Sequence, residues 1–337
     1  MIIGITKETY PYENRVALTP KTAALYHKLG FNIVMEQHAG IKACFDDHDY
    51  LQNQVEILSS ARDVLSRCNI WLKVRAPQIS EIKLLSDYTF IIGDFQGHNL
   101  NSQFNYLKKH HITCYALNQV ERTSRAQPFD VLSSQNNLAG YQAIIHAAAL
   151  YHSAFPLMIT SAGTVAPIKI LIIGIGVAGL QAIATAKRLG AKVYAYDLNY
   201  DLKEQAESLG AKFVEDFIPL LGEMNIIITS AFTSDKQAPL IITEEMLSQL
   251  RPHTLLMDMA VNFGGNIFKS TEHKITRCRG CIIYGAGNLA AEIPLTSSEL
   301  LSANIYNFTN YIYSKTTDTL HHNMDDSILT STLLIKG

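Results

Sequence analysis

Residues 168–197 read IKILIIGIGVAGLQAIATAKRLGAKVYAYD, and this stretch decides the fold. Its opening residues, 169–173, form an apolar run of the length expected for a buried parallel strand. Residues 181–189 continue at helical spacing up to Gly190, which favours a helix end. A second strand over residues 192–196 follows. The stretch therefore predicts a strand–helix–strand unit of a doubly wound α/β domain.

Three glycines after the first strand stand as G-x-G-x-x-G. Gly174 permits a tight turn, Gly176 lets the backbone approach a pyrophosphate, and Gly179 lets the helix pack closely on its strand. Asp197 ends the second strand, where an acid would bind a ribose 2′-hydroxyl. A carboxylate would repel a 2′-phosphate, and residues 198–200 contain no arginine to receive one, so NAD(H) is expected rather than NADP(H). The alternative, a glycine turn in a nucleotide-free domain, leaves Asp197 unexplained.

The composition excludes several classes of protein. A chain of 337 residues is long enough for two domains that each bury a core. A net charge of −2 without a basic run gives no reason to expect binding to nucleic acid. No uninterrupted apolar run reaches about 18 residues, and the N-terminus lacks the layout of a secretory signal. We therefore expect a cytoplasmic chain that does not insert into a membrane.

No metal site is expected from the cysteines and histidines. The five cysteines are scattered and odd in number, which suits a reducing compartment. Cys278 and Cys281 lack a second pair at zinc-site spacing, so they are interpreted as two thiols in a turn before a strand. The histidines at 110–111 and 321–322 are neighbours in sequence. Adjacent residues do not share a helix face, so both pairs are interpreted as surface histidines.

The first half of the chain alternates strands and helices, which predicts a second, mostly parallel sheet. The expected strands are residues 2–5, 32–36, 70–74, 88–93 and 113–116, and the expected helices are residues 20–29, 60–66, one that includes Leu84 and Leu85, and 100–110.

An alanine-rich helix over residues 133–154 is expected to join the two domains. Further strands of the second sheet are expected at residues 226–229, 254–257 and 281–284. A helix over residues 299–314 should return to the first domain through an apolar stripe of Leu300, Leu301, Ile305, Phe308 and Ile312. The expected domains are residues 1–132 with 299–337, and residues 133–298. We therefore predict two Rossmann-like, doubly wound α/β domains with parallel sheets and a nucleotide cleft between them.

Several segments carry a resemblance to a known family. Residues 4–9 (GITKET), 13–20 (ENRVALTP), 72–74 (LKV) and 259–266 (MAVNFGGN), together with the glycine motif, resemble the alanine dehydrogenase and proton-pumping nicotinamide nucleotide transhydrogenase family over nearly the whole chain.

Within that family, residues 121–135 (ERTSRAQPFDVLSSQ) resemble the segment of the transhydrogenase NAD(H)-binding component, called domain I, that surrounds the nicotinamide. Residues 161–167 (SAGTVAP) are also similar to transhydrogenases. The resemblance implies that Arg122, Gln127, Asp130 and Ser133 surround the nicotinamide and its ribose.

Hydride transfer needs ring orientation more than acid–base help, and amide, hydroxyl and charged groups supply orientation. The structural alternative is a loop whose arginine and aspartate pair with each other. Beside the glycines, the cofactor site is expected to include Val177, Ala178, Ala231 and Asn288.

A dehydrogenase of the same family is the main alternative. The resemblance places Arg15 and Lys73 at positions that hold a substrate carboxylate. The catalytic histidine of alanine dehydrogenases has Asp94 as its counterpart, and the catalytic aspartate is Asn262 here, which cannot ionise or accept a proton at neutral pH. Both losses argue against amino-acid oxidation. Arg15 and Lys73 would then be structural, paired with Glu8, Glu13 or another acid.

The chain also departs from transhydrogenases. These carry a long insertion with a mobile loop that closes over the nucleotide, whereas only residues 218–225 bridge the corresponding strands here. Residues 230–239 keep the following loop without its usual Pro-Gly-Lys core.

The sequence as a whole predicts an NAD(H)-binding transhydrogenase component that presents NADH for hydride transfer to NADP on a partner chain. A homodimer is expected. NADP(H)-binding and membrane subunits are the expected partners, and they could attach the chain to the inner membrane. The alternatives are an NAD-dependent amino-acid or keto-acid dehydrogenase of the alanine type, an opine dehydrogenase, and an NAD-binding regulatory protein that has lost catalysis.

Overall fold

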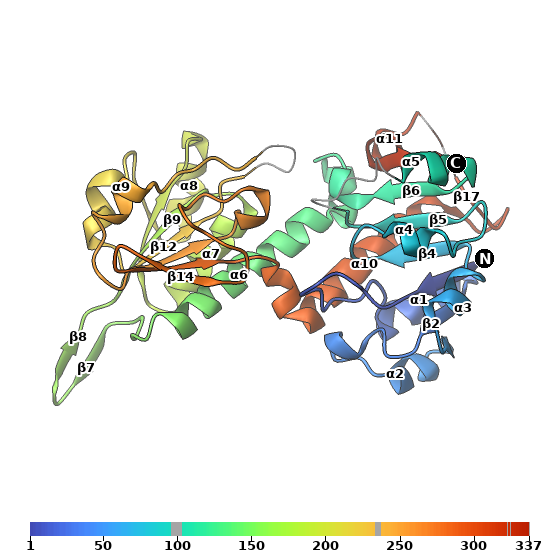
Figure 1. Cartoon of the computed structure of the whole chain (residues 1–337), viewed down its shortest axis with the longest axis horizontal. Helices are drawn as coiled ribbons and strands as arrows, with labels where there is room; N and C mark the ends of the chain where they lie inside the picture. The colour runs from blue at the N-terminus through green and yellow to red at the C-terminus, as the bar shows by residue number, and fades with distance from the viewer. Residues whose placement is uncertain (96–102, 233–236, 322, 324, 337) are drawn as a thin grey trace. The chain divides into compact units, whose positions relative to one another are not determined.

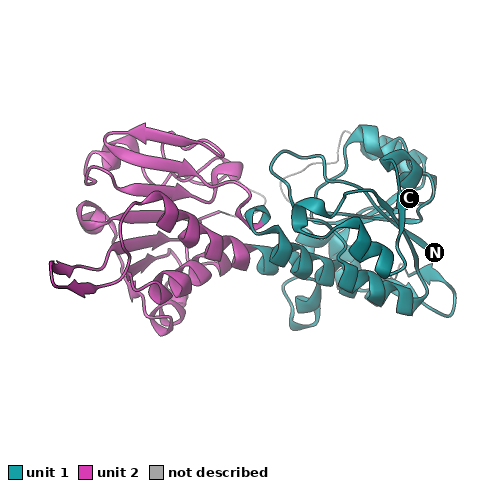
Figure 2. Cartoon of the chain, turned by 90° about the horizontal axis from the view of Figure 1, so that it is seen from below, with its two compact units in different colours: residues 1–135, 291–337 teal, residues 136–290 magenta. Residues whose placement is uncertain are grey.

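A computed structural model describes residues 1–95, 103–232, 237–321, 323 and 325–336 (Figure 1). The chain forms two compact units (Figure 2). Unit 1 comprises Met1–Gln135 and Ala291–Gly337, and unit 2 comprises Asn136–Ala290. Each unit is built on a seven-stranded sheet, so the predicted α/β class is confirmed. Whether the predicted ranges 1–132 with 299–337 and 133–298 fold independently stays a prediction.

The sheet of unit 1 is parallel except at one edge. Its strand order is β18-β6-β5-β4-β1-β2-β3, and only β18 runs antiparallel to its neighbour. The strands are β1 (Ile2–Ile5), β2 (Asn32–Glu36), β3 (Glu56–Leu58), β4 (Ile70–Lys73), β5 (Phe90–Gly93), β6 (Thr113–Ala116) and β18 (Leu333–Ile335). The end of the chain therefore completes the sheet that its beginning forms, through two edge strands, β3 and β18, that the sequence did not predict.

The helices of unit 1 are α1 (Pro20–Leu29), α2 (Asp47–Gln52), α3 (Ala61–Leu65), α4 (Ile79–Ile82), α5 (Phe104–Lys109), α10 (Pro294–Ile312) and α11 (Ser327–Thr332). Helix α1 has the predicted limits because Thr19 caps its N-terminus and Gly30 ends it with a φ of 99°. The prediction for Leu84 and Leu85 is wrong: α4 ends at Ile82, and both leucines lie in the turn that follows. The first residues of the helix predicted over 100–110 lie outside the described residues.

Helix α10 returns to unit 1, as predicted, and buries Leu301, Ile305, Phe308 and Ile312 in the core of that unit. Leu300 is 41% exposed, so its assignment to the stripe is wrong. One residue advances a helix by about 100°, which turns Leu300 away from the face that Leu301 occupies.

The sheet of unit 2 has the strand order β11-β10-β9-β12-β13-β15-β14. The strands are β9 (Lys169–Ile173), β10 (Lys192–Tyr196), β11 (Lys212–Phe213), β12 (Ile226–Thr229), β13 (Leu255–Asp258), β14 (Ile275–Cys278) and β15 (Cys281–Gly285). Without the antiparallel edge strand β14, this is the Rossmann order, which reverses between β9 and β12. Ligands of such sheets bind at the carboxyl ends of the strands beside that reversal.

Cys278 and Cys281 close a two-residue hairpin between β14 and β15. Arg279 and Gly280 form its turn with φ values of 50° and 80°, the left-handed pair that tight hairpins require. Both thiols are free. The predicted turn before β15 is confirmed, whereas the strand that ends at Cys278 was missed.

The helices of unit 2 are the second half of α6 (Val131–Leu150), α7 (Val177–Arg188), α8 (Lys203–Ser208) and α9 (Glu244–Leu247). Helix α6 is the predicted joining helix, and the boundary between the units falls inside it. It stops before residue 154, and His152 follows with a φ of 54°, which is outside the helical range.

A small hairpin stands away from the sheet of unit 2 (Figure 1). It pairs β7 (Met158–Thr160) with β8 (Gly163–Val165), and every residue of both strands is exposed. The sequence did not predict it.

Candidate functional site

The glycine turn lies at the carboxyl end of β9, and two of its glycines cannot be replaced without displacing backbone. Gly174 has a φ of 93°, and a Cβ there would lie 2.9 Å from the amide nitrogen of Ala231. A Cβ on Gly179 would lie 2.0 Å from the carbonyl oxygen of Gly174. Gly176 is different, because it is exposed and a Cβ there would meet nothing within 4 Å. The turn therefore leaves open space at the glycine assigned to the pyrophosphate.

Helix α7 begins at this turn without a side-chain cap. Gly176 is the N-cap residue and has no side chain to accept from the first amides, so these amides can receive an anion. Val177 is 40% exposed at the first position. Ala178 is buried, and a Cβ on Gly140 of α6 would lie 2.1 Å from its carbonyl oxygen. The sequence missed Gly140, although it predicted close packing from the small residues of α6.

Asp197 ties the glycine turn to β10. Its Oδ2 accepts from the Ile175 amide at 2.7 Å, and its Oδ1 accepts from the Asn199 amide at 2.8 Å. Each carboxylate oxygen can accept a second hydrogen bond, so the half-buried acid can still bind a ribose hydroxyl. Asp197 therefore fits both a structural and a ligand-binding role.

The loop after β12 is locked against the glycine turn. Ser230 Oγ donates to the Gly174 carbonyl at 2.9 Å. Asn266 Oδ1 accepts from the Ala231 amide at 3.1 Å, and its Nδ2 donates to the Ala231 and Pro239 carbonyls at 2.9 and 2.8 Å. Ala231 thus lies beside the glycine turn, as its predicted role requires. Reasoning from the sequence assigned no role to Ser230 or Asn266, although Asn266 ends the quoted MAVNFGGN motif.

The loop after β13 is built around a buried carboxylate. Asp258 accepts from the amides of Ala260 at 2.9 Å, Asn266 at 2.9 Å and Ile267 at 3.2 Å. Burial raises the pKa of Asp258, and these amide bonds oppose the rise. Asn262 is exposed in the same loop, and Asn288 is half-buried beyond the end of β15. No hydrogen bond joins Asn262 to another described residue.

The resemblance places the nicotinamide contacts in unit 1, in residues 121–133, which we call the nicotinamide segment. Asp130 caps α6: its Oδ1 accepts from the Ser133 amide at 2.9 Å and its Oδ2 from the Ser133 hydroxyl at 2.5 Å. Arg122 and Gln127 are exposed, and neither side chain bonds to any residue in the described ranges. The alternative in which Arg122 pairs with Asp130 is not what the described residues show.

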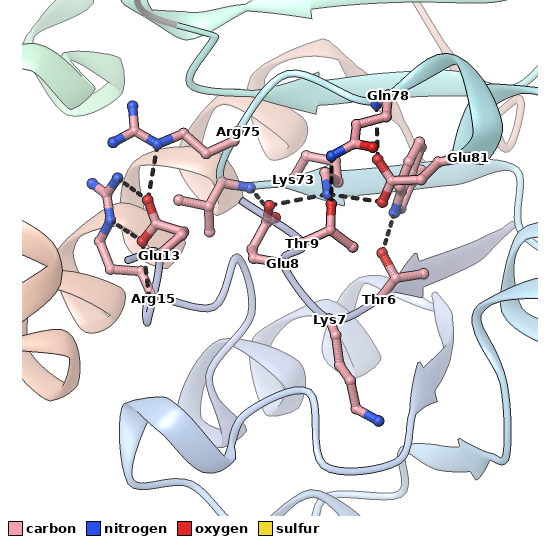
Figure 3. A network of polar contacts seen from close by, with 12 residues as sticks. Thr6, Lys7, Glu8, Thr9, Glu13, Arg15, Lys73, Arg75, Gln78 and Glu81 are labelled. Atoms are coloured by element: carbon pink, nitrogen blue, oxygen red, sulfur yellow. Dashed lines mark hydrogen bonds and ion pairs between the residues drawn. The ribbon is translucent and has the colours of Figure 1, made fainter. Parts of the chain in front are cut away.

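Arg15 lies in a buried network at the carboxyl end of β1 and β4 (Figure 3). Its Nε and Nη2 each donate to the Glu13 carboxylate at 2.8 Å, and Arg75 Nε donates to the same carboxylate at 2.9 Å. Arg15 Nη1 also donates to Gln135 Oε1 at 2.7 Å. Burial acts to raise the pKa of Glu13, but Arg15 and Arg75 outweigh it and hold that pKa at about 2.

Lys73 lies in the same network and is fully buried (Figure 3). Its Nζ lies 3.0 Å from Glu8 Oε2 and 3.3 Å from Glu81 Oε1. Burial acts to lower the pKa of Lys73, and the two carboxylates raise it above its usual range. The predicted structural pairing of Arg15 and Lys73 with Glu13 and Glu8 is confirmed.

Neither cation is therefore left unpaired for a substrate carboxylate. Asp94, the counterpart of the dehydrogenase histidine, is buried just after β5 and adds a further negative charge near Arg15.

One group of side chains in the described ranges lies close enough to share a metal ion: Asp46, His48 and Asp49. Asp46 and Asp49 form the capping box of α2, which explains their proximity without a ligand. None of the described helices has both the length and the apolar composition needed to cross a bilayer.

The strand order, the glycine turn and the acid of unit 2 define a protein with a Rossmann dinucleotide-type domain joined to a second α/β unit. Residues 143–337 match the family model of the alanine dehydrogenase/PNT C-terminal domain, and residues 4–139 match that of the N-terminal domain. The chain therefore belongs to the alanine dehydrogenase/PNT family.

Its similarity to transhydrogenase chains, expected from residues 121–135, is confirmed. The chain is 36% identical to an NAD(P) transhydrogenase subunit alpha protein of Rickettsia prowazekii, over 100% of this chain and 95% of that protein. The crystal structure of transhydrogenase from Sinorhizobium meliloti matches with a TM-score of 0.94 and 37% identity, over 100% of this chain and 99% of that one. The alanine dehydrogenase of Staphylococcus saprophyticus is more distant, with 26% identity over 94% of this chain and 88% of that protein.

Proposed function

We propose that this protein is the NAD(H)-binding component of a nicotinamide nucleotide transhydrogenase. It would present NADH for hydride transfer to NADP held on a partner chain. The observation that carries this proposal is the glycine turn, which is interlocked with Asp197 and Ala231 and left open at Gly176 and the first amides of α7. The bound dinucleotide supplies the hydride, and the protein supplies binding and orientation.

Each group of residues has a role in this function. The first amides of α7 would bind the pyrophosphate, and Asp197 the adenosine ribose. In the nicotinamide segment, Arg122 and Gln127 would orient the ring by hydrogen bonds from their exposed side chains. Asp130 and Ser133 would serve the ribose next to the ring, beyond their shared role in capping α6.

The buried network of unit 1 argues against the dehydrogenase alternative. Oxidation of an amino acid needs a free cation for the substrate carboxylate and a group that accepts a proton near the reacting carbon. Arg15 and Lys73 are neutralised by internal acids, and Asn262 cannot act as a base. Together these features favour transhydrogenation.

We also propose that the protein is a homodimer. Leu157, Met158 and Ile159 of the β7–β8 hairpin are 57%, 44% and 78% exposed, and residues 155–168 contain no charge. A two-stranded sheet is marginal by itself, and exposed edges usually carry charges that prevent pairing. A second copy of the chain is the partner that would cover such an arm with closed symmetry.

The other partners of the proposal are an NADP(H)-binding subunit and a membrane subunit. They would couple hydride transfer to proton translocation, and they would hold this chain at the inner membrane.

Two assays separate the proposal from its alternatives. The protein is incubated with NAD and alanine, glycine or other small amino acids, and NADH absorbance is followed. It is also titrated with NADH. Binding of NADH without amino-acid oxidation is the expected result. Rapid turnover of an amino acid would show a dehydrogenase, and absence of NADH binding would contradict the proposal.

A further inference from the structure

The C-terminal region of the chain grips the nicotinamide segment from outside. Ser327 Oγ donates to Glu121 Oε1 at 2.8 Å. Arg125 Nη2 donates to Asp326 Oδ1 at 2.8 Å, and Asp326 also caps α11. These contacts join residues about 200 positions apart in the sequence, so they are features of the fold rather than of the local loop.

Helix α10 holds the middle of the segment through one backbone carbonyl. Asn304 Nδ2 donates to the Pro128 carbonyl at 2.8 Å, and Asn307 Nδ2 donates to the same oxygen at 3.3 Å. Asn304 Oδ1 accepts from Ser134 Oγ at 2.8 Å, so one amide bridges both ends of this stretch. Phe129, between them, is 6% exposed, and its ring packs against Tyr311 of α10 with centroids 5.1 Å apart.

These contacts use the side chains of Glu121, Arg125, Phe129 and Asp130 within the segment. Arg122 and Gln127, the two side chains assigned to the ring, are the ones left exposed. Gln127 directly precedes Pro128, whose carbonyl the two asparagines fix.

We propose that Asn304 and Asn307 are positioning residues for hydride transfer, because they fix the Pro128 carbonyl and thereby set the direction of the Gln127 side chain. The inference rests on the proposed function, since it requires Gln127 to contact the nicotinamide. Residues 124–129 form a short 3₁₀ helix, whose own hydrogen bonds are weak, so the support must come from neighbouring elements. Small displacements of an orienting group reduce hydride transfer strongly, which makes such support functional.

The experiment compares two ligands that differ by the nicotinamide alone. Affinities for NADH and for ADP-ribose are measured by calorimetry on the full chain and on Asn304→Leu, Asn307→Leu, Gln127→Ala and the Asn304→Leu/Gln127→Ala double variant. Asn310→Leu is the matched control, since Asn310 is exposed on the same helix.

Asn304→Leu should weaken NADH about two- to tenfold, the range of one hydrogen bond, and leave ADP-ribose unchanged. Asn310→Leu should change neither. The double variant should lose no more than Gln127→Ala alone, because both changes remove the same contact.

The outcomes distinguish the inference from the function on which it rests. If Gln127→Ala lowers NADH affinity relative to ADP-ribose and Asn304→Leu does not, the positioning role is wrong and the proposed function stands. If Gln127→Ala also leaves the ratio unchanged, both are overturned. Equal weakening of both ligands by Asn304→Leu would show a general structural role and contradict the inference. Should Asn304→Leu not fold, Asn307→Leu decides, since a lowered ratio supports the inference and an unchanged ratio overturns it.

Discussion

Asp197 shows at the residue scale how one side chain can serve both the fold and the ligand. Its carboxylate holds the Ile175 amide of the glycine turn and would meet the adenosine ribose. The sequence predicted the second role from spacing. It could not predict the first, because the amide partners of an acid depend on how the turn folds back onto β10.

The charge of Asp197 should make NADH bind much more tightly than NADPH, because an acid repels the 2′-phosphate. Asp197→Ala should weaken NADH and narrow the gap. Asp197→Asn should narrow the gap while keeping an acceptor for the Ile175 amide. Fluorescence titration of both nucleotides measures these affinities, and equal affinities in the unmodified protein would sink the assignment.

Arg122 and Gln127 should matter more for hydride transfer than for NADH binding, because the adenosine and pyrophosphate contacts remain when they are removed. Loss of the charged Arg122 should cost about 1.5–3 kcal/mol in transition-state stabilisation, and loss of the neutral Gln127 about 0.5–1.5 kcal/mol. Steady-state rates with partner subunits, with the exposed Arg62→Ala as control, give these values. Unchanged turnover in Gln127→Ala would contradict the nicotinamide role.

Glu13 should make the stability of unit 1 depend on acidity. Its pKa lies at about 2 in the folded protein, below its ordinary 4.5, so its stabilising contribution is complete above 4.5 and is lost as the pH falls toward 2. Glu13→Gln should cost about 3–5 kcal/mol at pH 7, because Arg15 would keep a buried charge without its acid.

Urea unfolding at pH 7 and at about pH 3 tests this dependence. The exposed Glu204→Gln serves as the control. A Glu13→Gln variant as stable as the parent protein would show that the pair contributes nothing.

At the scale of elements, the predictable regions are those with strong local signals. The β9–α7–β10 unit and α1 have the predicted limits because glycines, caps and apolar runs agree. The strands β3, β7, β8, β14 and β18 were missed because each is only three or four residues long. Their pairing partners, and not their own residues, make them strands.

The β7–β8 hairpin should be the arm of a dimer. Ile159→Lys would place a charge at its most exposed apolar position, and it should shift the protein from dimer to monomer without loss of NADH binding. Sedimentation velocity measures the change, with Leu240→Lys as an exposed apolar control outside the hairpin. A monomeric parent protein, or a variant that stays dimeric, would contradict this role.

For the whole molecule, the sequence predicted the class, the two sheets and the neutralised dehydrogenase residues. It could not predict that Asn304 and Asn307 support the nicotinamide segment or that Asn266 locks Ala231, because these contacts join residues that are distant in the chain. The shorter connection between β11 and β12 remains a feature of this chain. Here residues 218–223 form a 3₁₀ helix in place of the long insertion expected from the resemblance.

Direct hydride transfer is the central claim, and an isotope experiment tests it. NADH carrying deuterium at the transferable position of the ring is mixed with NADP, this protein and the NADP(H)-binding and membrane subunits of a related transhydrogenase. Mass spectrometry of the NADPH formed then locates the label. We predict deuterated NADPH that appears only when this protein is present, and no label lost to water. Absence of NADPH in the complete mixture, or NADPH formed without deuterium, would contradict the account.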